Sequence, residues 1–441
     1  MKKNRERFNK IKSDISSSIG LYPAMISLAY LVLAFVLVNS RHSAISEWLA
    51  NRPWLSFESL DTPTAILTTL IGSIISLMVL SFSMVMVVLS QASSSFSPKI
   101  LRGLVSEKSH QVVLGNYLGS ILFCLVCLGN FSEEGDIHLL SAEVLISILF
   151  GLLCLVLFVV FIHNVSLAIQ ASEVIIRLYK KTRHHLQKFI DENRKEAGHP
   201  EDWPQEGEGQ IILSRQSGYL QRFQRKGLLN LAQKENLRIR LVIEVGDFVP
   251  IGVPVVEIYG EKNKISRESE EELLSFLHFY HGENIEENYT YGFTQLMEIG
   301  VKALSPGIND PGTARICIHY LTDLFHLRMQ WDDVGQACAE NGSPSLKWKV
   351  SSFQSLLYKS FEPIKIYGSN DIMILMSLVQ AIKTLAYFDA ERQVHRKVLQ
   401  AFYDQLLDLI SKNHSYKIDE MFVRPRLDDS NDTYLVLKEQ Y

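Results

Sequence analysis

Four stretches of the first 170 residues carry no charged side chain over a length that would cross a lipid bilayer. A helix that crosses the hydrocarbon core needs roughly 20 consecutive apolar residues, and a charge buried there is costly. The first stretch is too long, and the second follows it too soon, for a cleaved signal peptide. We therefore expect a membrane α-helical domain of four transmembrane helices within residues 1–170. The four stretches comprise residues 20–38, 63–90, 112–129 and 144–162.

Basic residues flank these stretches unevenly. Residues 1–18 hold six Lys or Arg, residues 91–111 hold three and residues 171–199 hold seven, whereas the opposite flanks hold two in 40–62 and none in 130–139. Short flanks rich in Lys and Arg stay in the cytoplasm. We therefore expect a multi-pass protein whose N- and C-termini are both cytoplasmic, together with everything after Gln170.

Hydroxyl residues recur at an unbroken spacing of seven along the second stretch. A straight helix drifts about 20° per heptad, so such a repeat keeps to one face only if helices supercoil gently. Two interpretations compete. Either the hydroxyls let helices pack closely inside the bundle, or copies of this helix from several subunits surround a hydrated pathway. The repeat comprises Thr62, Thr69, Ser76, Ser83, Ser90 and Ser97, of which Thr69, Ser76, Ser83 and Ser90 are the candidates for lining a pathway.

Polar side chains end the fourth stretch. His163, Asn164 and Gln170 lie close to the expected cytoplasmic boundary. An ionisable group at membrane depth is a candidate functional residue, and histidine side chains change charge near neutral pH. His163 is therefore a candidate gate or proton site. The alternative is that it reaches water or a neighbouring helix.

The remaining residues predict a cytoplasmic α+β region in three parts. Residues 171–210 are typical of a basic membrane-proximal helix, suited to anionic lipid headgroups, followed by a linker broken by proline and glycine. Apolar and polar residues alternate over 237–245, which is the period of a half-buried strand, and residues 211–262 are expected to form a small β-rich module. Helical periods return over 263–441, including 271–280, and predict a C-terminal bundle of about six helices.

A stiff polar turn, VKALSPGINDPGTA, interrupts two of these helices. Pro306 stops the first helix and Gly307 can take the positive φ that closes it. Asn309 or Asp310 then caps the second helix, with Pro311 at its first position. The turn is either a plain helix connection or a contact for a ligand or another subunit at open first-turn amides. The candidate residues are Ser305, Pro306, Gly307, Asn309, Asp310, Pro311 and Thr313.

The segments ALSPGINDPGTA and YGFTQLMEI resemble the signature of DUF2254, a bacterial family of predicted integral membrane proteins without an assigned activity. Similarity to that family extends to GSIISLMVLSFSMVMVVLSQASSSFSPKIL, FIHNVSLAIQ, GDFVPIGVPV and SFEPIKIYG, so that the resemblance covers nearly the whole chain. It implies a protein of the bacterial inner membrane. Asn164 stands where the family commonly has a second histidine, so the resemblance implies no metal-binding pair.

Signatures of enzymes are missing from the sequence. It has no G-x-x-x-x-G-K loop, no G-x-S-x-G elbow and no H-E-x-x-H. Cys124 and Cys127 have C-x-x-C spacing, but within an apolar helix such a pair is expected to pack rather than to bind metal. The net charge is −4 and no basic-aromatic patch stands out, which disfavours nucleic acid. We therefore expect no enzyme activity, no cofactor, no metal and no nucleic-acid partner.

Three classes of function fit these features. The first is a homo-oligomeric channel or transport protein that passes an ion or small ligand, with the cytoplasmic region assembling or gating it. The second is a membrane-anchored sensor or scaffold that binds a ligand or partner near Asn309, and the third is an unrecognised membrane-associated enzyme. We favour the first and keep the second as the alternative, because four spans are too few for most monomeric transporters.

Reporter fusions test the expected orientation. Alkaline phosphatase fused after Tyr441 is expected to be inactive, and green fluorescent protein fused there is expected to fluoresce, because the basic flanks hold this end inside. Fusions within residues 130–139 are expected to give the opposite pair of results. Phosphatase activity at the C-terminus would contradict the orientation.

Overall fold

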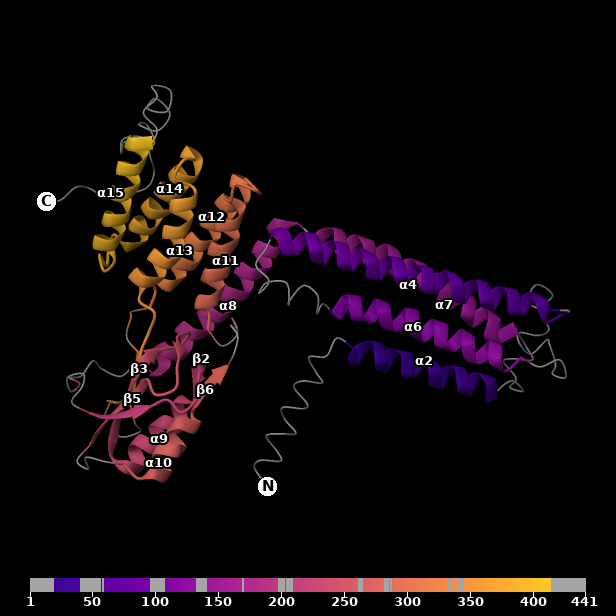
Figure 1. The fold of residues 1–441 in the computed structure, drawn as a ribbon, viewed down its shortest axis with the longest axis horizontal. Coiled ribbons are helices and arrows are strands. Elements are labelled where there is room, and N and C mark those ends of the chain that lie inside the picture. Colours follow the sequence, from indigo (N-terminus) through magenta and orange to yellow (C-terminus); the bar gives the residue numbers. More distant parts are fainter. Residues whose placement is uncertain are drawn as a thin grey trace. The chain divides into compact units, whose positions relative to one another are not determined.

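The computed structural model divides the chain into two compact units, Met1–Gln170 and Ala171–Tyr441. Figure 1 shows the helices and strands of both units, and each unit is described by itself. The structure describes residues 20–39, 57, 59–95, 108–131, 141–168, 170–196, 203, 209–260, 265–280, 285, 288–331, 333, 335–338 and 344–413.

The described part of the first unit consists of four helices: α2 (Leu21–Asn39), α4 (Asp61–Ser95), α6 (Lys108–Gly129) and α7 (Ser141–Ala168). Each contains one of the predicted apolar stretches. Helix α6 packs against the other three, and α4 also packs against α7. In hydrocarbon no water is available to bond backbone amides and carbonyls, so a spanning segment must satisfy them internally, as a helix does.

Small residues bring α2 and α6 into close contact. A Cβ atom added to Gly115 would lie 3.0 Å from Cα of Pro23, and one added to Gly119 would lie 2.7 Å from the ring of Tyr30. The Tyr30 hydroxyl donates a hydrogen bond to Oδ1 of Asn116 at 2.7 Å. Close backbone approach and interhelical hydrogen bonds are the usual sources of helix association in lipid.

Five of the described helices, rather than the four predicted stretches, are long and apolar enough to cross a membrane. The additional helix is α14 (Ile372–Asp389) of the second unit. In contrast to the other four, most of its apolar window is buried, at 67%. Length and hydropathy alone therefore do not fix the number of spans.

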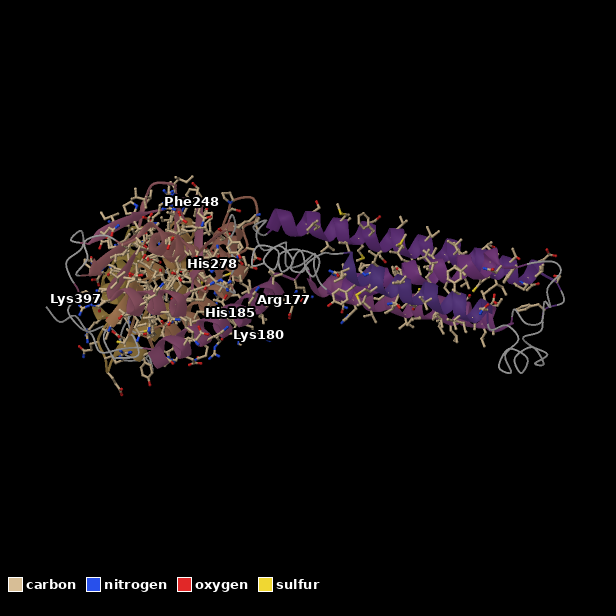
Figure 2. All side chains as sticks on the ribbon, turned by 90° about the horizontal axis from the view of Figure 1, so that it is seen from below. Arg177, Lys180, His185, Phe248, His278 and Lys397 are labelled. Carbon is tan, nitrogen blue, oxygen red and sulfur yellow. The ribbon has the colours of Figure 1, made fainter. Side chains whose placement is uncertain are left out.

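The described part of the second unit contains seven helices besides α14, one of which, α9 (Arg225–Glu235), covers a sheet and is described with it. Helix α8 (Ala171–Glu196) packs along α11 and α12, and Arg183 of α8 forms an ion pair with Asp323 of α12 at 3.4 Å. Figure 2 labels Arg177, Lys180 and His185 along α8. Burial and the neighbouring Asp323 raise the pKa of Tyr179 to about 12, and the Tyr179 hydroxyl donates to Oδ2 of Asp323 at 2.6 Å. The other helices are α10 (Arg267–Ser275), α11 (Thr290–Ala303), α12 (Pro311–Arg328), α13 (Phe353–Tyr367) and α15 (Arg396–Asn413).

Two sheets form the β part of the second unit. The larger has the strand order β1-β5-β3-β8-β7, in which β3 pairs with β8 in parallel and all other pairs are antiparallel; the smaller has the order β4-β2-β6. The strands are β1 (Gln210–Leu213), β2 (Gly218–Phe223), β3 (Leu237–Glu244), β4 (Phe248–Val249), β5 (Pro254–Gly260), β6 (Leu277–Tyr280), β7 (Gly335–Cys338) and β8 (Pro344–Lys349).

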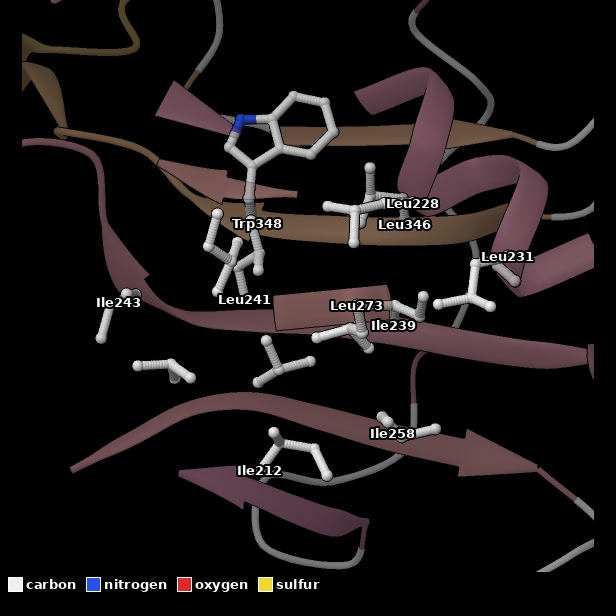
Figure 3. Packing of buried hydrophobic residues seen from close by; sticks show 14 of the residues in the cluster. Ile212, Leu228, Leu231, Ile239, Leu241, Ile243, Ile258, Leu273, Leu346 and Trp348 are labelled. Carbon is white, nitrogen blue, oxygen red and sulfur yellow. The ribbon is translucent and has the colours of Figure 1, made fainter. Parts of the chain in front are cut away.

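The core of these sheets follows the predicted alternation of β3. Ile239, Leu241 and Ile243 are buried in one cluster with Ile258 of β5 and Leu346 of β8 (Figure 3). Helix α9 (Arg225–Glu235) covers this core through Leu228 and Leu231. Burial of alternate residues on a strand is what the two-residue period predicts.

Three strands of the two sheets, β6, β7 and β8, lie in segments that the sequence predicted to be helical. Residues 271–280 were expected to be helical, but α10 ends at Ser275 and β6 begins at Leu277, so this prediction is wrong over its second half. Strands β7 and β8 come from the range expected to be wholly helical, and β8 lies beside β3. The contiguous range 211–262 therefore does not contain the whole sheet, because long-range pairing decided the conformation of these short apolar segments.

Gly292 of α11 is required by close packing against α8. A Cβ atom at this position would lie 2.7 Å from Cβ of Thr182. We expect Gly292→Ala to destabilise the protein by about 1–3 kcal/mol, the usual cost of overpacking, measured as a lower Tm of the detergent-solubilised protein. Gly307→Ala is the control, because a Cβ there meets no atom within 4 Å. Equal effects of the two substitutions would contradict the packing assignment.

Candidate functional site

The hydroxyl repeat of α4 lies on a face that the other described helices of the first unit do not cover. Thr62, Thr69, Ser76, Ser83 and Ser90 are all exposed, whereas Ser97 lies outside the described residues. The opposite face is buried through Leu67, Ile74 and Ser81. Within the described bundle of one chain, the hydroxyls are therefore not packing residues.

The exposed face of α4 is uncharged and only mildly polar. The Ser73 hydroxyl donates to the Thr69 carbonyl at 2.7 Å, and the Ser76 hydroxyl donates to the Gly72 carbonyl at 2.8 Å. Their oxygens keep lone pairs that can accept a hydrogen bond. Leu80 and Val87, both exposed, lie between the hydroxyl residues on the same face by helical spacing. The face can thus contact either a neighbouring helix or water.

The boundary residues of α7 lie at its last described turns. His163 is exposed, Asn164 is half-buried and Gln170 is exposed just after the helix. The ring of His110, near the start of α6, lies 5.5 Å from that of Phe161 and so brings a second histidine to this end of the unit. No group of three or more metal-ligating side chains occurs within the residues that the structure describes.

The polar turn is organised around Asp310, the N-cap of α12. The Thr313 amide donates to Oδ1 of Asp310 at 3.0 Å, the Thr313 hydroxyl donates to Oδ2 at 2.6 Å, and Pro311 occupies the first helical position. These hydrogen bonds, the one from the hydroxyl foremost, hold the pKa of Asp310 below its ordinary value. The amide that an outside anion would use is therefore occupied by the chain's own carboxylate.

The residue that takes the positive φ in this turn is Asn309, at 50°, and not Gly307 as expected. The Ser305 carbonyl accepts from the amides of Ile308 and Asn309 at 3.0 and 2.9 Å. The Asp310 amide then donates to the Ala303 carbonyl at 2.8 Å and closes the loop. Asparagine tolerates the left-handed region better than other residues with a side chain, so the reversal falls one residue before the cap.

A cleft of about 530 Å³ lies within the second unit, away from all the residues predicted from sequence. Six elements contribute to its walls: α8, the end of β2, the start of α9, the end of β3, the start of α11 and the end of β8. Its charged lining comprises Lys188, Arg222, Arg225, Lys226 and Lys349 against Glu192 and Glu244, and its aromatic lining comprises Phe189, Phe223, Tyr289 and Trp348. Five cations face two carboxylates, so the cleft favours anions.

A buried arginine supports the floor of this cleft. Arg328 is fully buried; its Nε donates to the Tyr289 hydroxyl at 3.2 Å and its Nη2 donates to the Ser351 carbonyl at 2.8 Å. Asp333 neutralises Arg328 through an ion pair. Burial raises the pKa of Tyr289, although Arg328 opposes the shift, so the hydroxyl stays protonated near neutral pH. Tyr289 and Ser351 both line the cleft, and their positions are thereby fixed.

Sequence reasoning missed this cleft because its cations and aromatic rings are scattered over six segments. The only local signal was QRFQRK, residues 221–226, which alternates basic residues with a phenylalanine. Chain folding adds Lys188 and Phe189 from α8 and Trp348 and Lys349 from β8. A basic-aromatic site therefore exists although no such patch stands out in linear order.

The apolar helices of the first unit define a membrane protein, and the second unit gives it a separate α+β part. The chain belongs to the family DUF2254, described as predicted membrane proteins, whose model matches residues 16–384. This confirms the resemblance found in the sequence.

Comparison with curated proteins finds mycobacterial relatives. The uncharacterized proteins Mb1321c of Mycobacterium bovis and Rv1290c of Mycobacterium tuberculosis are each 24% identical over 333 residues, which cover 73% of this chain and 62% of theirs. The chain thus spans less than two thirds of the length of these relatives. No solved structure matches the chain significantly.

The capping role of Asp310 predicts a pH-dependent stability effect. Asp310→Ala is expected to destabilise the protein by about 1 kcal/mol near pH 7, measured by calorimetry in detergent. Because the pKa of Asp310 is lower in the folded state, the contribution is fully present above the ordinary value of about 3.9 and is lost as pH falls through the folded value. Asn309→Gly, which accepts the positive φ, is the near-neutral control. An unchanged Tm for Asp310→Ala at neutral pH would contradict the capping role.

Proposed function

We propose that this protein is an oligomeric channel or transport protein of the bacterial inner membrane, in which α4 helices from several copies line a pathway for an ion or small solute. In this proposal α2, α4, α6 and α7 are the four transmembrane helices, and both termini lie in the cytoplasm. The unit from Ala171 onward assembles or gates the pathway, while α14 remains part of that unit.

The hydroxyl face of α4 is the observation that carries the proposal. One helix cannot enclose a pathway, and the described helices of the same chain leave Thr69, Ser76 and Ser83 exposed. The spacing of seven suits a left-handed supercoil of identical helices, and small residues let their backbones approach. The occupant of this face that best fits the pattern is therefore α4 of a second copy.

Comparison with α7 favours a helix over lipid as the neighbour of the hydroxyl positions. The exposed side of α7 is built from large aliphatic residues, as lipid contact favours, whereas the exposed side of α4 combines hydroxyls and Gly72 with large apolar residues such as Val79, Leu80 and Phe82. Helix α4 has 35 residues, about 52 Å at 1.5 Å per residue, and so exceeds the roughly 30 Å hydrocarbon core. Its C-terminal turns are long enough to leave the membrane on the proposed cytoplasmic side.

The alternative role, a membrane-anchored sensor, is supported by the basic-aromatic cleft rather than by the polar turn near Asn309. The polar turn uses the Thr313 amide for its own cap, so it offers less to an outside ligand. A cytoplasmic sensing role would depend instead on the basic-aromatic cleft, whose walls come from both the helical and the β parts of the second unit.

The pathway is tested by two tryptophan substitutions at neighbouring positions. Ser83→Trp is expected to block or sharply reduce ion flux into vesicles reconstituted with the protein, because it fills the face shared between copies. Phe82→Trp, at an exposed position on another side of α4, is expected to leave flux unchanged. Flux is measured with an internal potassium-sensitive dye, and oligomeric state is measured by light scattering in mild detergent.

Two results would overturn the proposal. A monomer in mild detergent that also gives no flux would remove the assembly on which the pathway depends. Well-folded oligomers without flux for any small ion or solute would remove the transport role and leave α4 as an assembly surface.

A further inference from the structure

We infer that the basic-aromatic cleft of the second unit is a binding site for a ligand of the nucleotide class, a small molecule that joins phosphate groups to a flat aromatic base. This inference is independent of the proposed pathway. It concerns only residues of the unit Ala171–Tyr441, and it holds or fails whether or not α4 lines a channel.

The charge of the cleft selects an anion. Among the described residues, neither Lys226 nor Lys349 has a carboxylate within ion-pairing distance, and both are exposed at the rim. Lys188 and Glu192 form a long exposed pair at 3.9 Å, which contributes little to stability and leaves both groups available. The chain as a whole carries a net charge of −4, so this positive cleft is a local feature and not a consequence of composition.

The start of α9 adds to this preference. Arg225 and Lys226, the first two residues of the helix, line the cleft. The N-cap residue Gln224 makes no side-chain hydrogen bond to the first-turn amides, in contrast to Asp310 at the start of α12. A helix N-terminus without a side-chain cap carries partial positive charge, which suits a phosphate.

The partly exposed side chains of Arg225, Phe223 and Phe189, backed by the buried rings of Trp348 and Tyr289, provide the surface for a base. The Arg225 guanidinium lies 4.6 Å from the ring centroid of Trp348, and the Phe223 ring lies 5.4 Å from that of Trp348. On the α8 side, Phe189 is half-buried and its ring contacts that of Tyr289 at 4.9 Å. Nucleic-acid bases stack on aromatic side chains and on arginine planes of this kind, which a bare phosphate or sulfate does not use.

Polar groups on the floor are already held in place. Asn288 accepts from the Thr290 amide and hydroxyl at 3.0 and 2.8 Å and donates to the Val245 carbonyl at 3.0 Å. Gln221 donates to the Tyr291 hydroxyl at 3.3 Å. A floor fixed in this way requires little reordering when a ligand enters, which favours affinity.

The size of the cleft suits one small ligand. Its volume of about 530 Å³ falls within the roughly 300–1,000 Å³ typical of small-molecule sites. A nucleic-acid polymer would instead need an extended basic surface. Residues of α8, β2, β3, α11 and β8 meet here, so a bound ligand would bridge the helical and β parts of the unit.

Titration calorimetry on the full-length protein in detergent tests this site, with ADP, adenosine and inorganic phosphate as separate probes. ADP is expected to bind, and to bind more tightly than either fragment, because only ADP uses both the cations and the rings. Lys349→Glu and Lys226→Glu, both at exposed positions, are expected to weaken ADP binding about tenfold or more, since each replaces an attraction by a repulsion. Arg225→Ala is expected to reduce the advantage of ADP over phosphate.

The matched control is Lys397→Glu, a change of the same charge at an exposed position of α15 outside the cleft (Figure 2). It is expected to leave ADP binding unchanged. Equal weakening by Lys349→Glu and Lys397→Glu would overturn the site, as would the absence of ADP binding to protein whose Tm is normal. Phosphate binding as tight as ADP binding would overturn the nucleotide class, because the aromatic walls would then have no part in recognition.

Discussion

The absence of water from the hydrocarbon core is the constraint on which the first unit depends. Backbone amides and carbonyls must bond within the segment that enters lipid, so an uncharged stretch of about 20 residues has the helix as its one accessible conformation. Once the four apolar segments are helices, packing chooses between their faces. Glycines and Asn116 on α6 bring α2 close, and Leu67 and Ile74 turn one side of α4 inward.

The packing of α4 decides which of its faces carries the hydroxyl repeat. Leu67, Ile74 and Ser81 are buried on one side of α4, and this places the hydroxyl repeat on the opposite, exposed side. Serine and threonine are tolerated in lipid because they can bond to a carbonyl four residues earlier, as Ser76 does. The same hydroxyls can still accept a bond from water or from a neighbouring helix. Their exposure is thus compatible with assembly and with hydration, and both belong to the proposed function.

The second unit is held together by long-range pairing. The parallel pairing of β8 with β3 joins residues about a hundred positions apart, and α8, the first helix of this unit, packs on α11 and α12. The cleft lies where these long-range elements meet. Arg328 links its floor to the following loop through Asp333 and the Ser351 carbonyl. A charge buried this deeply is tolerated only with such partners, so the floor and the helical core are energetically coupled.

The sequence alone predicted the apolar helices, the alternation of β3 and a cap at Asn309 or Asp310 before α12, because each depends on residues close together in the chain: uncharged length, a two-residue period, and an Asn-Asp-Pro run before a helix. It identified the family through the same local segments. Only the tertiary structure decided that Leu277–Tyr280 is a strand, that β8 completes the larger sheet, and that Asn309 rather than Gly307 reverses the turn. The tertiary structure alone also shows that one face of α4 is exposed and that six segments form the cleft. These features depend on partners distant in sequence, and a linear pattern does not contain the identity of those partners.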